Sequence, residues 1–241
     1  MSSEHPNRCC PTDKGAAKCH YDPTGNDFYV VGPYDAKAGI VVVGDIFGML
    51  PNSKRLADVL AADDYLVVMP DFFGAKAWPE SEWPADFESE RWKNYVAEIT
   101  QMDNFKPRME RAIALLRRMG CEKVGAIGMC WGSALTFMMA AEGSIDAAAT
   151  AHPSFFFADA VKAAKTPVLV MPSKDEPPMD EVEAAVKAHP VEPHMYKRFD
   201  KIPHGFLGAR YDPDTYTAEE LEEVKEARTL AADFFEKALR S

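Results

Sequence analysis

Short runs rich in valine, isoleucine and leucine recur along this 241-residue chain, and segments with helical spacing separate them. Strands that are buried on both faces of a parallel sheet are apolar almost throughout, so each run predicts a strand of such a sheet. The regular alternation of strand and helix predicts an α/β fold with a mainly parallel, doubly wound sheet flanked by helices. The predicted strands lie at or beside residues 30–31, 40–43, 65–69, 123–127, 147–150, 168–171 and 194–199.

Two helical segments are marked by their spacing. Apolar residues recur every three to four positions across 109–119, and Gly120 stops that run. Thr217 and Glu220 have the spacing of a capping box, and an apolar stripe follows over 221–238. A doubly wound sheet has right-handed crossovers and carries its active site at the carboxyl ends of the strands. Candidate catalytic residues should therefore directly follow strands.

Composition and charge narrow the classes of partner. Apolar residues make up 47% of the chain, which is enough for a buried core. The formal net charge of −11 argues against nucleic acid as a partner, since phosphates require a basic surface. The first residues lack the apolar segment of a secretory signal, and no apolar run approaches the roughly 20 residues that span a bilayer. We expect a cytoplasmic protein that binds no membrane, with a loosely ordered arm at 1–25 and one domain at 26–241.

The chain has five cysteines. An odd number without a secretion signal favours reduced thiols over a disulfide framework. Cys9, Cys10 and Cys19, followed by His20, are candidate metal ligands. Adjacent cysteines are poorly placed to share a tetrahedral site, however, and no second pair follows at zinc-like spacing. We therefore interpret these three as free thiols in the arm, and expect no metal site.

The segment IGMCWGSA, residues 127–134, lies between a predicted strand and a predicted helix. Gly128, Cys130 and Gly132 form G-x-C-x-G, the cysteine version of the nucleophile elbow G-x-S-x-G. The glycines leave room where strand and helix pack closely. Amide groups at the start of the helix favour a thiolate or a developing oxyanion. A buried structural cysteine fits an isolated motif equally well, so the interpretation depends on partner residues.

An acid and a base should follow the nucleophile in that order, each after a later strand. Asp175 follows the apolar run TPVLVMP, and His204 follows the run MYKRF. Cys130, Asp175 and His204 thus fill the three roles in order. We predict that Cys130 is the nucleophile, His204 the base and Asp175 the acid.

Competing acids and bases fit less well. Asp180 and Glu181 open the next predicted helix, where acids are ordinary N-terminal residues. His189 ends a helix, and His194 precedes its strand. His152 does follow a strand, so it remains an alternative base or a residue that lines the site.

Five segments carry a resemblance to a known family. With these segments, the chain resembles the dienelactone hydrolases (carboxymethylenebutenolidases) of the α/β-hydrolase superfamily across most of residues 28–240. The resemblance implies a single-domain α/β-hydrolase fold and a Cys-His-Asp triad that cleaves a small-molecule ester or lactone through a thioester, without a cofactor. The segments are VVVGDIFGM (41–49), YLVVMPDFFG (65–74), IGMCWGSA (127–134), SKD (173–175) and IPHGF (202–206).

The resemblance also assigns residues around the nucleophile. An acidic residue before Ile-Phe-Gly contacts the resting nucleophile in the family, and the matching residue is Asp45, where well-known members carry glutamate. An aspartate that caps the turn before Gly48 is the plain alternative. Backbone N–H groups of Ile46 and Trp131 match the family's oxyanion hole.

Two arginines match residues that bind a substrate carboxylate in the family. Arg91 lies four residues before a tyrosine, and Arg210 lies six residues beyond His204. Either is equally well explained as a solvated surface charge. The tryptophans in the long insert between strands predict a lid or site wall, or residues that pin the insert to the core. These are Trp78, Trp83 and Trp92.

Two other functions use the same sequence features. A general carboxylesterase or thioesterase would share the triad and would not need the arginines. A non-catalytic binding protein of this fold would usually carry a broken triad, whereas all three residues are present here. The sequence is compatible with a monomer or a homodimer.

Overall fold

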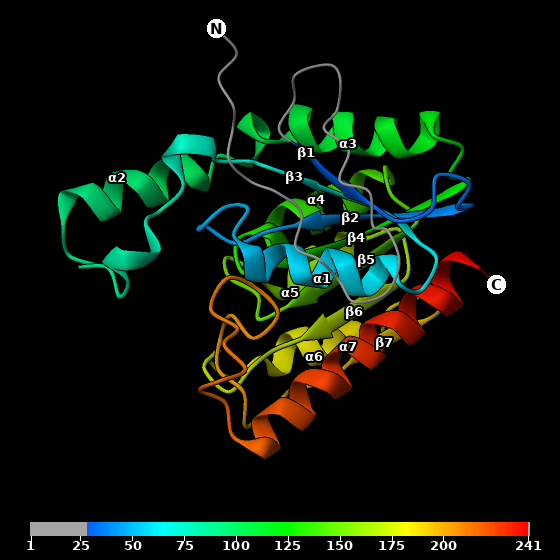
Figure 1. The fold of residues 1–241 in the computed structure, drawn as a ribbon. Coiled ribbons are helices and arrows are strands. Elements are labelled where there is room, and N and C mark those ends of the chain that lie inside the picture. The colour runs from blue at the N-terminus through cyan, green and yellow to red at the C-terminus, as the bar shows by residue number, and fades with distance from the viewer. Residues whose placement is uncertain (1–27, 241) are drawn as a thin grey trace, which may run out of the picture.

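The protein is described by a computed structural model over residues 28–240. A seven-stranded sheet forms its centre (Figure 1). The strands are β1 (Phe28–Val31), β2 (Ala38–Val43), β3 (Leu66–Pro70), β4 (Lys123–Met129), β5 (Ala147–Ala151), β6 (Val168–Met171) and β7 (His194–Tyr196). Their order is β1-β3-β2-β4-β5-β6-β7, and only the β1–β3 pair is antiparallel among these strands. The predicted α/β fold is confirmed.

Helices cover both faces of the sheet. Helices α1 (Pro51–Ala61) and α7 (Ala218–Leu239) pack on one face. The other face carries α3 (Lys106–Arg118), α4 (Gly132–Glu142), α5 (Ala158–Ala163) and α6 (Asp180–Lys187). Alternate residues of β2 serve the two cores: Val41 and Val43 pack toward α3 and α4, whereas Ile40 and Val42 pack toward α1 and α7. Burial on both faces explains why the strands are apolar throughout.

The predicted helix boundaries agree closely with the structure. Helix α3 ends at Arg118, and Gly120 follows in the left-handed conformation at φ 99°. At the start of α7, Thr217 Oγ1 accepts a hydrogen bond from the Glu220 N–H at 3.2 Å, and Glu220 Oε2 accepts one from the Thr217 N–H at 2.8 Å. This is the predicted capping box. Strand β7 is shorter than expected, because regular pairing with β6 ends at Tyr196.

An insert between β3 and α3 stands out from the body of the molecule (Figure 1). It contains α2 (Glu90–Ile99) and three short 3₁₀ helices, η1 (Gly74–Lys76), η2 (Glu80–Glu82) and η3 (Met102–Asn104). Trp78 is buried, and its ring lies 4.9 Å from that of Trp92 and 5.1 Å from that of Tyr95. Trp83 packs on Trp92 at 6.0 Å. The tryptophans thus hold the insert together and onto the core.

The arm predicted at 1–25, with Cys9, Cys10 and Cys19, lies outside the described residues. Within residues 28–240, no three histidine, cysteine or acidic side chains are grouped so as to hold a metal ion. In the same range, no helix has the length and apolar character needed to cross a membrane.

Candidate active site

Cys130 occupies a sharp turn between β4 and α4. Its φ of 54° is left-handed, a conformation that is strained for a residue with a side chain and that recurs at functional sites. A Cβ on Gly128 would collide with the carbonyl of Gly132, and one on Gly132 would collide with the carbonyl of Val43. Both glycines are therefore required by close packing of α4 on β4 and β2. The turn presents Cys130 at the carboxyl edge of the sheet.

The thiol of Cys130 has a neighbour that the sequence did not indicate. Its Sγ lies 3.4 Å from Oγ of Ser154, and the Ser154 N–H donates to the Cys130 carbonyl at 3.0 Å. Ser154 follows β5, so a residue at the end of a second strand contacts Cys130. No motif surrounds Ser154, and only the folded sheet brings it to Cys130.

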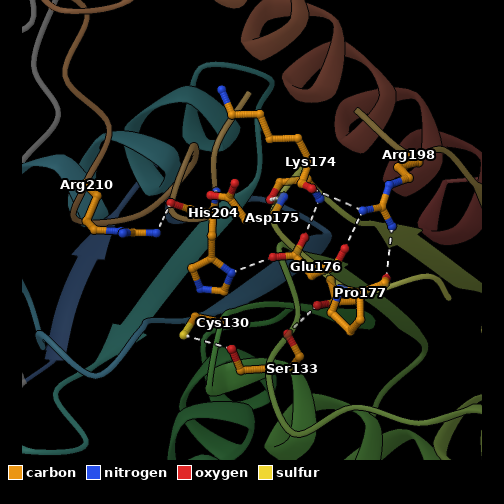
Figure 2. A network of polar contacts seen from close by, with 12 residues as sticks. Cys130, Ser133, Lys174, Asp175, Glu176, Pro177, Arg198, His204 and Arg210 are labelled. Carbon is orange, nitrogen blue, oxygen red and sulfur yellow. Dashed lines mark hydrogen bonds and ion pairs between the residues drawn. The ribbon is translucent and has the colours of Figure 1, made fainter. Parts of the chain in front are cut away.

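The ring of His204 lies between Cys130 and an acid (Figure 2). That acid is Glu176, whose Oε1 is 2.6 Å from Nδ1 of His204. Glu176 is buried, and its second carboxylate oxygen accepts a hydrogen bond from the Ser173 N–H. Arg198 donates to the Glu176 carbonyl, which fixes the turn that carries the acid. The imidazole is thus held by a carboxylate that is itself restrained.

The ring contact of Glu176 corrects the prediction for Asp175. Asp175 is exposed, and its Oδ2 accepts a hydrogen bond from the backbone N–H of His204 at 2.8 Å. Both acids lie in one tight turn after β6, where Ser173 Oγ accepts from the Asp175 N–H at 3.2 Å. Consecutive residues of such a turn point in different directions. Asp175 therefore positions the backbone of His204, while Glu176 contacts its ring.

The environment of His204 favours the protonated ring. Burial by itself lowers the pKa of His204, but the Cys130 sulfur and the Glu176 carboxylate outweigh it and raise the pKa to about 10. An unfolded histidine titrates near pH 6.5. Protonation of His204 therefore contributes stability that is fully present below about pH 6.5 and is lost as the pH rises toward 10.

His152 lies behind the site and not at its surface. Its ring is fully buried, 4.8 Å from the ring of His204 and 5.1 Å from that of Phe206. Within residues 28–240, neither ring nitrogen has a hydrogen-bond partner. Burial, and then the positive charges of His204 and Arg210, hold the pKa of His152 well below its usual value. The buried ring of His152 thus packs against His204 and does not reach the surface, where an open substrate site would lie.

Asp45 holds two loops together. Its Oδ1 accepts from the Phe47 N–H at 3.1 Å, and its Oδ2 accepts from the Ala209 N–H at 2.8 Å. Burial raises the pKa of Asp45, while these two N–H donors and the charge of His204 act against that rise. The contact with resting Cys130 that the resemblance implied is not formed, because both carboxylate oxygens face backbone amides. The loop after β2 is thereby fastened to the loop after His204.

The two residues expected to form an oxyanion hole are anchored by the insert. The Ile46 carbonyl accepts hydrogen bonds from the Trp78 N–H at 2.9 Å and the Tyr95 hydroxyl at 3.1 Å. The Trp131 indole N–H donates to the Ile99 carbonyl at 2.7 Å. The hydrogen bonds formed among residues 28–240 leave the backbone N–H groups of Ile46 and Trp131 without an acceptor. Backbone N–H groups without an acceptor are the kind of donor from which an oxyanion hole is built.

The two predicted substrate-binding arginines differ in position. Arg91 is exposed, pairs with Glu82 and stacks over Trp78 with its guanidinium 4.7 Å from the ring centre. Arg210 donates to the backbone carbonyl of His204 and lies 5.4 Å from the ring centre of Trp83. Arg210 thus contacts His204 itself, whereas Arg91 contacts Glu82 and Trp78 in the insert.

Comparison with known families places the chain in one of them. The model of the dienelactone hydrolase family matches residues 27–239. The chain belongs to the dienelactone hydrolase family. Family membership makes the protein a hydrolase.

Relatives and solved structures agree with this assignment. The hydrolase pyvD of Aspergillus violaceofuscus is 30% identical over 86% of this chain and 87% of its own length. The carboxymethylenebutenolidase homolog of Mus musculus is 28% identical over 82% of this chain and 85% of its own length. A putative dienelactone hydrolase from Klebsiella pneumoniae superposes with a TM-score of 0.65 at 18% identity, covering 85% of this chain and 90% of the other. That likeness shows the shared fold.

The pairing of His204 can be tested by NMR titration of its ring. We expect a pKa near 10 in the wild type. Cys130→Ala and Glu176→Gln should each lower it, because each removes a group that favours the imidazolium. Asp175→Asn, the matched control one residue away, should leave the pKa within about half a unit, since Asp175 contacts only the backbone N–H. A larger drop in Asp175→Asn than in Glu176→Gln would contradict the assignment of the ring partner.

Proposed function

We propose that this protein hydrolyses carboxylic esters or lactones through a thioester on Cys130. The observation that carries the proposal is Cys130, on a strained elbow, beside an imidazole whose other nitrogen is held by the buried carboxylate of Glu176. A nucleophile, a base and an acid that orients the base are the parts of a hydrolytic triad. The resemblance implied a Cys-His-Asp triad, and we propose Cys-His-Glu.

The first half-reaction forms the thioester. A thiolate on Cys130, with its proton on His204, attacks the carbonyl carbon, and the carbonyl electron pair moves to oxygen. The N–H groups of Ile46 and Trp131 stabilise that oxyanion, with each donor typically contributing about 3 kcal/mol. The intermediate collapses, the bond from carbon to the leaving oxygen breaks, and His204 protonates that oxygen. In a lactone the same step opens the ring.

The second half-reaction releases the acid. His204, now neutral, takes a proton from water while the water oxygen attacks the thioester carbon. The tetrahedral intermediate expels the Cys130 sulfur as a thiolate, and the His204 imidazolium balances its charge. Because a thiolate is itself a good leaving group, poor substrates return to starting material. Activated esters and enol-lactones are therefore favoured over amides.

Arg210 points to an acidic substrate. It lines a cavity of about 420 Å³ together with Phe47 and Trp83, next to the loop of His204. A guanidinium beside the base can bind a carboxylate that the substrate carries. The mouse relative is named as a homolog of carboxymethylenebutenolidase, an enzyme of carboxylated lactones by that name. We therefore propose a lactone or ester with a carboxylate as the substrate class.

A general esterase with the same triad is the second candidate. The cavity that contains Arg210 is also lined by Glu80 and Asp212, which repel a carboxylate. A neutral ester would meet no such repulsion. The substrate comparison below separates the two.

Replacing the nucleophile tests the chemistry itself. Cys130→Ala should abolish hydrolysis of p-nitrophenyl acetate and should remove the acetyl adduct that intact-mass spectrometry detects on the wild type. Cys121→Ala is the matched control, because Cys121 is buried beside Ala36 and precedes β4, whereas the elbow follows the other end of that strand. It should keep both activity and adduct. Full activity in Cys130→Ala would exclude the proposed mechanism.

Two neighbouring acids provide a matched test of the triad. Glu176→Gln should lower kcat/KM by roughly 10²- to 10⁴-fold, because a neutral amide does not stabilise the imidazolium. Asp175→Asn keeps an oxygen that accepts from the His204 N–H, so we expect a loss below about 10-fold. The measurement is kcat/KM of both variants and the wild type on the same ester. The reverse order of losses would restore Asp175 as the acid.

The two arginines test the substrate class. With a carboxylated lactone such as cis-dienelactone, Arg210→Gln should raise KM at least about 10-fold, since a charged hydrogen-bond pair is lost. Arg91→Gln should change KM little, because its guanidinium pairs with Glu82. Arg91→Gln should leave turnover of p-nitrophenyl acetate unchanged, and Arg210→Gln should lower it by less than about 10-fold, because a hydrogen bond to the His204 carbonyl is lost. Turnover of the neutral ester alone would favour the general esterase.

A further inference from the structure

A cavity of about 290 Å³ lies where residues 72–76, the end of α2 and the start of α3 meet. We call it the α2–α3 pocket. Neither Cys130 nor His204 lines it. Its walls include Phe72, Phe73, Tyr95, Phe105, Arg108 and Arg111. The pocket is thus separate from the cavity that contains Arg210.

The lining combines flat apolar rings with positive charge. Lys76 pairs with Glu98 at 2.7 Å, and Arg108 donates to the Asp71 carbonyl. Arg111 has no hydrogen-bond or ion-pair partner among residues 28–240. The chain as a whole carries a net charge of −11, so a pocket lined by more positive than negative side chains is unusual for this protein. Aromatic walls and an unpaired guanidinium together suit an aromatic ring that carries a carboxylate.

The inner wall of the pocket also supports Trp131. The Trp131 indole packs on Phe73 and Phe105, each with ring centres 4.8 Å apart, and on Phe72 at 5.5 Å. Ile99, another wall residue, accepts the hydrogen bond of the Trp131 indole N–H. A ligand in the pocket would therefore touch the side chains that fix Trp131.

The same wall reaches the second proposed oxyanion donor. Tyr95 lines the pocket, and its hydroxyl donates to the Ile46 carbonyl at 3.1 Å. Both residues whose backbone N–H groups we assign to the oxyanion hole are thus held by residues of this one pocket. An occupant that orders or displaces this wall would alter stabilisation of the transition state without entering the substrate site.

We propose that the α2–α3 pocket binds a small aromatic carboxylate and thereby tunes turnover at Cys130. Its volume is near the lower end of known ligand pockets and fits one or two fused rings. The effect on turnover rests on the proposed hydrolase mechanism, whereas binding does not. Binding and kinetics therefore test the two separately.

Isothermal titration calorimetry with 2-naphthoate tests the site. We expect one molecule per chain, and Arg111→Gln should weaken binding about 10-fold through loss of a charge-assisted contact. Arg118→Gln is the matched control, because Arg118 is an exposed arginine at the other end of α3. Arg210→Gln controls for binding at the substrate site. Neither control should change the affinity.

Several calorimetric results would overturn the proposal. One is the absence of any heat of binding at millimolar 2-naphthoate. Another is an equal loss of affinity in Arg111→Gln and Arg118→Gln. A third is a loss of affinity in Arg210→Gln with none in Arg111→Gln. All can be observed even if no ester is ever turned over. A failure of the hydrolase mechanism would instead appear as wild-type enzyme without turnover or adduct.

Kinetics test the coupling to Cys130. With p-nitrophenyl acetate as substrate, saturating 2-naphthoate should change kcat by at least twofold in wild type and leave KM nearly constant. The concentration of 2-naphthoate that gives half of the change in kcat should rise about 10-fold in Arg111→Gln, matching the loss of affinity measured by calorimetry. Purely competitive inhibition, or binding without any change in kcat, would contradict the proposed coupling.

Discussion

The approach of α4 to β2 and β4 is the constraint on which the candidate site depends. The Gly132 backbone lies directly against the Val43 carbonyl, and Gly128 lies against the Gly132 carbonyl. Such spacing leaves no room for a side chain at either glycine. It forces Cys130 into a left-handed turn, and it places the first amides of α4 beside the loop that follows β2. The positions of Cys130 and of the proposed oxyanion donors therefore depend on one packing contact, before any polar interaction is considered.

Sequence order was sufficient to locate the parts of the site that depend on strand ends. Cys130 and His204 follow β4 and the β7 segment, and parallel neighbours bring such positions to one edge of the sheet. The same reasoning predicted the sheet, α3 and the capping box at Thr217, because each has a local pattern. None of these depends on how one side chain points relative to another.

The predictions that differ from the structure concern residues whose contacts depend on where the side chain points. Asp175 and Glu176 are adjacent acids, and their directions are set by Ser173 and by Arg198, which binds the turn from a distant segment. Asp45 was expected at the thiol, yet two backbone amides hold its carboxylate. Ser154 carries no pattern at all. Long-range contacts decide such details, and spacing along a chain does not record them.

Asp45 has a consequence for how the site behaves as a unit. The buried Asp45 carboxylate accepts hydrogen bonds from the backbone N–H groups of Phe47, in the loop after β2, and of Ala209, in the loop after His204. The loop of Ile46, a proposed oxyanion donor, and the loop that follows His204, the proposed base, are therefore fastened to each other. Thermal motion that separates them would have to leave a buried carboxylate without its donors, which is costly. If the proposed roles are right, the oxyanion donor and the base are therefore ordered together, and an arrangement with only one of the two loops in place is disfavoured.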